Sequence, residues 1–332
     1  MRSLLILSLL LLANTALAQT VNVYSFRQPF LIKPILEEFE KETGIKSKVI
    51  FAKKGLVQRI KREGKLSPAD VVLTSNFSKL LELKDKDLSQ PYDAGSLVEK
   101  NIPSQFRDQD RHWLALTQRV RNIYSSKTRM GPLDIRYEDL ANAEYKGKIC
   151  TRSGKHPYNL GLIASMIAHS GEAATETWLK GVKDNLARKP QGNDRGQVKA
   201  IKEGLCDLSL GNSYYYGKML MDKKQKVWAD AVTLNFPNQS DRGVHINVSG
   251  AVIAKFAPHK AAALKLLDFL SSDKAQAMYA ELNMEYPVKV GVSPSKLVQT
   301  WGTFKADPLA LNKIAAQRAN ALRLVDKVKF DL

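Results

Sequence analysis

The chain has 332 residues, of which 44% are hydrophobic and 25% charged, a composition typical of a globular protein with room for two compact domains. Its formal net charge is +18, which raises the question of an anionic partner. The basic residues are spread along the whole chain and form no recognisable nucleic-acid module, so a dedicated nucleic-acid-binding protein is excluded.

The N-terminus has the three parts of a secretory signal peptide. Met1-Arg2 is a short basic start, Leu4 to Leu12 is an apolar run, and Ala16-Leu17-Ala18 is a small-x-small cleavage signal. The apolar run is too short to span a bilayer. We therefore predict that residues 1–18 are removed after Ala18 and that the mature protein is periplasmic. The alternative, a buried N-terminal helix, leaves the agreement of the three parts unexplained.

The next segment alternates strand and helix patterns. We predict strands at 21–24, 48–51 and 69–73, with helices at 30–43, ending at Gly44, and around Leu56, Val57 and Ile60. A βαβαβ unit of this kind implies a parallel sheet covered by helices on both faces.

A second alternation starts near residue 147. We predict strands at 147–151 and 205–210, a weak strand at 185–188, and helices at 159–169 and from an Asn193 or Asp194 cap to about 203. The extended apolar segments 113–125 and 244–256 are expected to cross between two lobes. Helices are predicted at 258–282 and 308–325, and we expect this tail to pack on the first lobe.

These patterns predict an α/β fold of the two-lobed, type II-like periplasmic binding-protein class, with a helix-flanked sheet in each lobe and a ligand cleft between the lobes. The N-terminal lobe is expected to comprise residues 19–117 and 250–332, and the C-terminal lobe residues 118–249. The two cysteines, Cys150 and Cys206, lie in strand-like segments. In an oxidising compartment such a pair indicates a disulfide, and two buried free thiols are the alternative.

A run of tyrosines follows the predicted strand 205–210. Tyr214, Tyr215 and Tyr216 are consecutive, whereas phenols are usually spread through a core. Ferric iron prefers anionic oxygen, tyrosinate is an iron ligand, and a bound cation can remove the phenolic proton. Two adjacent tyrosines reach one ion only if the backbone is turning. Ordinary aromatic packing remains the alternative for the run considered alone.

Tyr158 and Tyr24 stand at comparable places, before a predicted helix and at the end of the first strand. The matching motifs resemble those of the periplasmic ferric-binding proteins of ABC iron importers, in a tyrosine-rich subgroup; they are Tyr24-Ser25-Phe26-Arg27, Thr151-Arg152-Ser153, Tyr158-Asn159, Gly192-Asn193-Asp194 and Asn212-Ser213-Tyr214-Tyr215. The resemblance covers nearly the whole mature chain.

The resemblance implies a set of iron ligands. Tyr214 and Tyr215 match the adjacent pair of the family, and Tyr158 matches the additional tyrosine of the subgroup. Tyr24 is the expected ligand from the N-terminal lobe. Gln28 stands where some members carry a histidine, so we expect Gln28, with Arg27, to lie beside the ligands, and Gln28 at most to be a weak one.

The resemblance also implies a basic segment that holds carbonate or another small anion on the iron. Arg119 is the first candidate and Arg121 the second, because a guanidinium fork suits a planar anion. An ordinary ion pair is the alternative for each. We expect Tyr216 to turn away, and the five histidines show no metal-ligand spacing.

The predicted function is capture of Fe(III) and its delivery, by a monomer, to an ABC permease in the inner membrane. The same fold binding an oxyanion or small organic anion is the alternative. A secreted enzyme is disfavoured because the chain has no H-E-x-x-H, G-x-S-x-G or P-loop motif.

Overall fold

A computed structural model describes residues 19–332, so the predicted signal peptide lies outside the described residues. The first half of the chain contains β1 (Thr20–Ser25), α1 (Pro29–Thr43), β2 (Lys46–Phe51), α2 (Leu56–Glu63), β3 (Val71–Thr74), α3 (Phe77–Asp85), β4 (Ser89–Gln90) and α4 (Leu97–Asn101). β1 pairs in parallel with both β2 and β3, so the predicted βαβαβ unit is confirmed.

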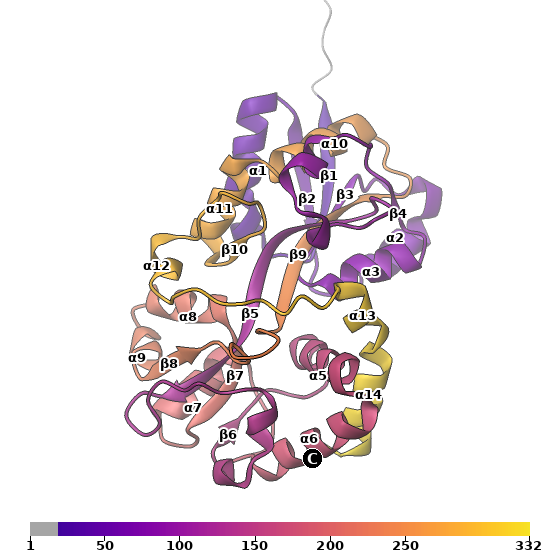
Figure 1. The fold of residues 1–332 in the computed structure, drawn as a ribbon. Coiled ribbons are helices and arrows are strands. Elements are labelled where there is room, and N and C mark those ends of the chain that lie inside the picture. Colours follow the sequence, from indigo (N-terminus) through magenta and orange to yellow (C-terminus); the bar gives the residue numbers. More distant parts are fainter. Residues whose placement is uncertain (1–18) are drawn as a thin grey trace, which may run out of the picture.

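Two long strands connect the halves of the molecule (Figure 1). They are β5 (Leu114–Ser126) and β9 (Ile246–Ala254), which pair with each other antiparallel from Leu114 to Val120 of β5. β9 also pairs with β3, whereas β5 continues from Arg121 along β7 and then β8. Gly250 lets β9 lie close to β5, because a Cβ at this position would be only 2.2 Å from the carbonyl oxygen of Leu114. The predicted crossings are therefore present.

The second half contains β6 (Ile149–Cys150), α5 (Pro157–Ser170), α6 (Glu172–Asp184), α7 (Asp194–Lys202), β7 (Leu208–Asn212), α8 (Ser213–Leu220), α9 (Lys226–Ala229) and β8 (Val232–Asn235). The predicted strand at 185–188 is wrong. Asn185 follows the last residue of α6, and its side-chain amide donates to the carbonyls of Leu140 and Asn142. Within 185–188 Leu186 alone forms a β-bridge, to Ile149 of β6. Cys150 and Cys206 form the predicted disulfide.

The tail contains α10 (Lys260–Leu270), α11 (Asp273–Asn283), β10 (Tyr286–Pro287), α12 (Lys296–Gln299), α13 (Leu311–Ala316) and α14 (Arg318–Lys327). The region predicted to be helical at 258–282 contains two helices, and the second begins where Ser272 caps it by accepting from the amide of Ala275. α10 packs on β1 and α11 on α1, as expected for the first lobe.

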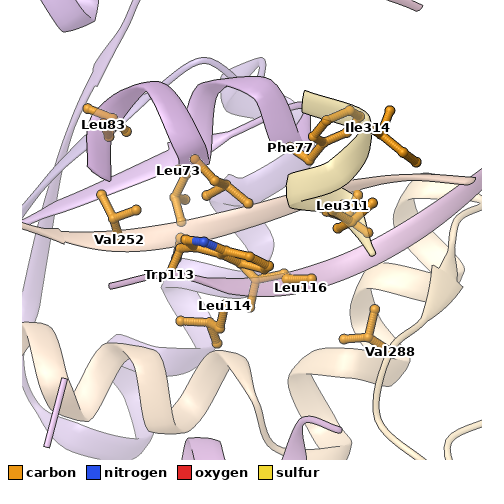
Figure 2. Packing of buried hydrophobic residues seen from close by; sticks show 14 of the residues in the cluster. Leu73, Phe77, Leu83, Trp113, Leu114, Leu116, Val252, Val288, Leu311 and Ile314 are labelled. Carbon is orange, nitrogen blue, oxygen red and sulfur yellow. The ribbon is translucent and has the colours of Figure 1, made fainter. Parts of the chain in front are cut away.

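The end of the tail corrects the predicted assignment of all of 250–332 to the N-terminal lobe. α13 contacts both α3 and α5, and α14 packs against α5 and α6 in the other half of the molecule (Figure 1). Figure 2 shows Leu311 and Ile314 of α13 beside Phe77 of α3, where burial of apolar side chains fixes the bridge. None of the helices within 19–332 is long and apolar enough to cross a membrane.

Candidate metal-binding site

Three phenol groups meet where α5 and α8 begin. Tyr214 and Tyr215 lie in the first turn of α8, directly after β7, and Tyr158 lies in the first turn of α5. The hydroxyl oxygens of Tyr158 and Tyr214 are 3.2 Å apart, and the ring centroids of Tyr214 and Tyr215 are 4.2 Å apart. All three side chains are partly exposed. The backbone is helical here, so the adjacent tyrosines avoid the opposite directions that a strand would impose.

The first turn of α8, which carries Tyr214 and Tyr215, is held in place by a hydrogen bond to β5. The hydroxyl of Ser213 is buried and accepts a hydrogen bond from the amide of Val120 on β5, at 3.2 Å. This bond ties the first residue of α8 to the strand that crosses between the halves. The positions of the two phenols therefore depend on the crossing strand.

Tyr214 and Tyr215 hold their phenolic protons when no cation is bound. Burial and the neighbouring phenols Tyr158 and Tyr215 raise the pKa of Tyr214 well above its usual value, although Arg119 acts in the opposite direction. Burial, with the nearby Tyr158, raises the pKa of Tyr215 to about 12. A trivalent cation reverses this cost, because phenolate oxygens then replace water around the ion. Within residues 19–332 no three His, Cys, Asp or Glu side chains lie together so that they could hold a metal ion.

Tyr216 does not join the three phenols. Its ring packs against Tyr124 at 6.1 Å and against Trp301 at 5.5 Å between centroids, so it turns away as predicted. His156 caps α5 by accepting from the amide of Tyr158. Burial and the nearby Arg152 lower the pKa of His156 to about 3, so its ring is neutral at ordinary pH and can accept this bond.

Arg119 is the arginine best placed for an anion. Its guanidinium carbon lies 5.8 Å from the Tyr158 ring centre and 6.0 Å from that of Tyr214. One terminal nitrogen donates to the carbonyl of Ser75 and the other is 3.5 Å from Glu285, while its Nε has no partner within residues 19–332. A buried donor without a partner is costly, so this Nε fits an anion or a water.

Arg27 shares the same carboxylate. Its Nη2 is 2.7 Å from Glu285, whose Oε2 also accepts from the hydroxyl of Thr117 at 2.6 Å. Arg27 lies near enough to Tyr214 for their charges to interact, and its Nε and Nη1 have no partner within the described chain. Burial would raise the pKa of Glu285, but Arg27 and Arg119 outweigh burial and lower it, so the carboxylate is ionised.

Arg121 has buried partners at both of its terminal nitrogens. Its Nη1 binds Asp194 at 2.7 Å and Asn212 at 3.1 Å, and its Nη2 binds Asn159 at 2.6 Å. Asp194 is fully buried and also pairs with Arg152 at 3.0 Å. Although the Arg121 guanidinium lies 6.0 Å from the Tyr158 ring, its terminal nitrogens are occupied by these partners. The ion pair with Asp194 is therefore present, while the Nε of Arg121 has no partner within residues 19–332 and an anion contact there stays a prediction.

Tyr24 makes no hydrogen bond with the three phenols within the described residues, so its predicted role as a ligand stays a prediction. Its side chain is fully buried, and its hydroxyl donates to Glu63 of α2 at 2.9 Å. The guanidinium of Arg59 lies 5.0 Å from its ring centre. Burial and the hydrogen bond to Glu63 raise the pKa of Tyr24. Tyr24 has the surroundings of a structural residue that holds α2 on the sheet.

Gln28 precedes the first residue of α1 and is partly exposed. Its side chain makes no capping hydrogen bond to the start of α1. It lies directly after Arg27, so it stands at the edge of the charged group that reaches Tyr214. The structure gives no direct contact between Gln28 and the phenols.

Two acidic residues of this region were missed from the sequence. Glu285 was not considered, although a lone acid between Met284 and Tyr286 in an apolar stretch is a signal for a buried partner. Of the two predicted caps, Asn193 and Asp194, Asn193 is the cap, accepting from the amide of Gly196 at 3.0 Å, and the pairing of Asp194 with arginines was not foreseen. Asp194 instead joins two arginines to the backbone amide of Asn212.

Comparison with known proteins agrees with this arrangement. Residues 65–302 match the family described as bacterial extracellular solute-binding protein. The chain is 40% identical to iron uptake protein A1 of Synechocystis over 93% of this chain and 87% of the relative.

Two solved structures superpose closely. The apo ferric ion-binding protein A of Pasteurella haemolytica is 58% identical, with a TM-score of 0.90 over 95% of this chain and 99% of that one. The Trichodesmium protein solved in complex with iron and citrate ligands is 37% identical, with a TM-score of 0.90 over 94% and 99%. The predicted two-lobed α/β fold is thereby confirmed. The chain belongs to the bacterial extracellular solute-binding proteins and, as the tyrosine motifs predicted, to their ferric-binding family.

Proposed function

We propose that this protein binds ferric iron in the periplasm through Tyr158, Tyr214 and Tyr215 and delivers it to an ABC permease of the inner membrane. The observation that carries the proposal is the convergence of the three phenols, with 3.2 Å between the Tyr158 and Tyr214 oxygens. Fe(III) is a hard cation that prefers anionic oxygen, and relatives of this chain are named for iron uptake and ferric binding. The iron is the cargo, and the signal peptide predicted from the sequence supports a periplasmic location.

The surrounding charges favour a small anion as an additional iron ligand. Four guanidinium groups are buried around the phenols, those of Arg27, Arg119, Arg121 and Arg152. Within the described part of the chain, Glu285 and Asp194 are the only acids that pair with them. Two positive charges are therefore in surplus among these six side chains. Ferric iron with three phenolates is neutral, so a dianion such as carbonate matches the surplus, with Arg119 as its holder.

The N-terminal lobe acts mainly through charge in this proposal. Tyr24 is engaged by Glu63, whereas Arg27 lies near Tyr214 and Gln28 directly follows it in the chain. We place Arg27 and Gln28 beside the anion or a water bound to the iron. Opening of the lobes at the permease removes these contacts, and protons then compete with iron for the phenolates.

The alternative of an oxyanion as sole ligand is less well supported. Such a site would use the unpaired guanidinium donors of Arg27 and Arg119, but it gives no role to the phenols that meet beside them, with 3.2 Å between the Tyr158 and Tyr214 oxygens. We also propose that the protein is a monomer without catalytic activity, since the relatives are named as binding and uptake proteins.

Substitution of the phenols tests the site. Ferric affinity is measured by competition with citrate for the wild type, for the double variant Tyr214→Phe/Tyr215→Phe, and for Tyr216→Phe. Tyr216 is a matched control, because it lies on the same helix and packs away from the cluster. We expect the double variant to lose tight binding and Tyr216→Phe to retain it. Unchanged affinity in the double variant would show that the phenols are not the ligands.

A further inference from the structure

The last residues of the chain fasten the loop that leads into Tyr158. This loop, residues 151–156, connects β6 to α5, and Tyr158 is the second residue of that helix. We propose that Asp331 is a positioning residue for iron binding, which holds Tyr158 against Tyr214 through this loop. The inference rests on the proposed ferric function and adds to it a residue far away in the sequence.

The carboxylate of Asp331 binds the loop with both oxygens. Its Oδ2 accepts from the hydroxyl of Ser153 at 2.6 Å, and its Oδ1 accepts from the amide of Gly154 at 2.7 Å. Hydrogen bonds to an ionised acceptor are shorter and stronger than those between neutral groups. Asp331 is partly buried, so water competes for these two donors only in part.

Apolar contacts reinforce the same attachment. A Cβ added at Gly154 would lie 2.8 Å from the Phe330 ring and 3.0 Å from a methyl group of Val325. The C-terminal segment thus lies directly on the backbone of the loop, and only glycine leaves room for it. Lys155 also pairs with Asp326 at 2.5 Å, but both side chains are about half exposed, so this pair adds little.

The loop is held from its other side by the buried network. Arg152 pairs with Asp194, and the side-chain amide of Asn159 donates to the Arg152 carbonyl at 3.0 Å. The loop is therefore fixed between Asp194 inside and Asp331 outside. Tyr214 and Tyr215 sit on α8, which has its own attachment to β5 through Ser213. Loss of Asp331 should consequently affect Tyr158 and leave the other two phenols in place.

The experiment is a double-mutant cycle between Asp331 and Tyr158, carried out on the full mature chain. Ferric affinity and the tyrosinate-to-iron absorption band are measured for Asp331→Ala and Asp331→Asn, each with Tyr158 present or replaced in Tyr158→Phe. We expect Asp331→Ala to weaken ferric binding roughly 10–100-fold, the range typical for residues that orient metal ligands. Its band should move toward that of Tyr158→Phe. In the Tyr158→Phe background the same substitution should have no further effect, because the residue it positions is gone.

Glu172→Gln serves as the matched control. Glu172 pairs with Arg323 of α14 at 3.8 Å, so the substitution removes one charge from the same helix-docking surface without contacting the loop. We expect wild-type affinity and an unchanged band from it. If Asp331→Ala unfolds, the nearly isosteric Asp331→Asn gives the same comparison.

The outcomes separate the inference from the function on which it rests. Wild-type affinity and an unchanged band in both Asp331 variants would overturn the positioning role while leaving ferric binding intact. An equal loss with and without Tyr158 would also overturn it, because the effect would then be general destabilisation. A wild-type protein that neither binds ferric iron nor gives the band would refute the proposed function and this inference together.

Discussion

Asp194 pairs with two buried arginines beside the phenol site, and its replacement by asparagine should destabilise the fold. The carboxylate is fully buried and receives Arg121 at 2.7 Å, Arg152 at 3.0 Å and the amide of Asn212 at 2.9 Å. Asp194→Asn keeps the shape but removes the charge, and its amide nitrogen faces one of the two guanidinium groups. Two buried cations then lose their counterion.

The magnitude follows from this loss. Removing one partner of a buried ion pair costs about 3–5 kcal/mol, because the remaining charge stays out of water. Asp194 serves two arginines, so we expect Asp194→Asn to lower the free energy of unfolding by at least about 3 kcal/mol. Burial would raise the pKa of Asp194, but Arg121 and Arg152 outweigh it and lower the pKa. The ionised carboxylate therefore stabilises the fold fully above about pH 4, which is close to the usual pKa of an aspartate, and this stabilisation is lost as the pH falls further.

The assay is urea unfolding followed by circular dichroism, at pH 7 and at several lower pH values. Asp230→Asn is the control, since Asp230 pairs with Lys226 at 2.7 Å on the surface, where both side chains are about half exposed. The control should change stability by less than about 1 kcal/mol. A loss below about 1 kcal/mol in Asp194→Asn, or a loss that grows as the pH falls, would refute the reasoning.

Four further results are expected. Tyr24→Phe should retain ferric affinity and lose about 1 kcal/mol of stability with the Glu63 hydrogen bond; a tenfold loss of affinity in a citrate competition would restore Tyr24 as a ligand. Burial raises the pKa of Tyr215 to about 12, so its phenol is protonated at pH 7 and ferric affinity should fall as the pH falls. In a pH-stat titration Tyr215→Phe should therefore release about one proton fewer per iron than the wild type, and an equal release would contradict ligation by Tyr215. Arg119→Gln should weaken ferric binding more with bicarbonate present than without it, and an equal loss in both would exclude Arg119 as the anion holder. Replacing Cys150 and Cys206 by serine should cost about 4 kcal/mol in urea unfolding, and a stability equal to that of wild type would contradict a role in stabilising this half.

The fold could be predicted where local patterns determine it. Apolar runs and helix-ending glycines were enough for the βαβαβ unit and for the crossings that became β5 and β9. The packing of α14 could not be predicted, because an amphipathic helix shows one apolar face but not which surface covers it. The same applies to the tail as a whole, whose helices are similar in composition but pack on different halves.

The site divides in the same way. Tyr214 and Tyr215 were found because they are adjacent in the chain, and their position at a strand end was visible in the sequence. Tyr24 also ends a strand, but its direction depends on Glu63, which approaches from α2, 39 residues later. For Arg121 the sequence left an anion contact and an ordinary ion pair open, because Asp194, 73 residues away, gives no local sign that it is the partner. Charge pairing between distant segments is decided by tertiary packing, which the pattern of one segment does not contain.

The most direct test of iron binding by the three phenols is a ferric citrate titration of the purified protein, followed by visible absorption and resonance Raman spectroscopy. Tyrosinate bound to ferric iron gives a visible charge-transfer band, and excitation within it enhances the vibrations of the phenolate ring. We expect the band to saturate at one iron per chain and to weaken in each single variant, Tyr158→Phe, Tyr214→Phe and Tyr215→Phe. Ferric binding without a visible band, or a band that persists when all three phenols are removed, would contradict the tyrosine site.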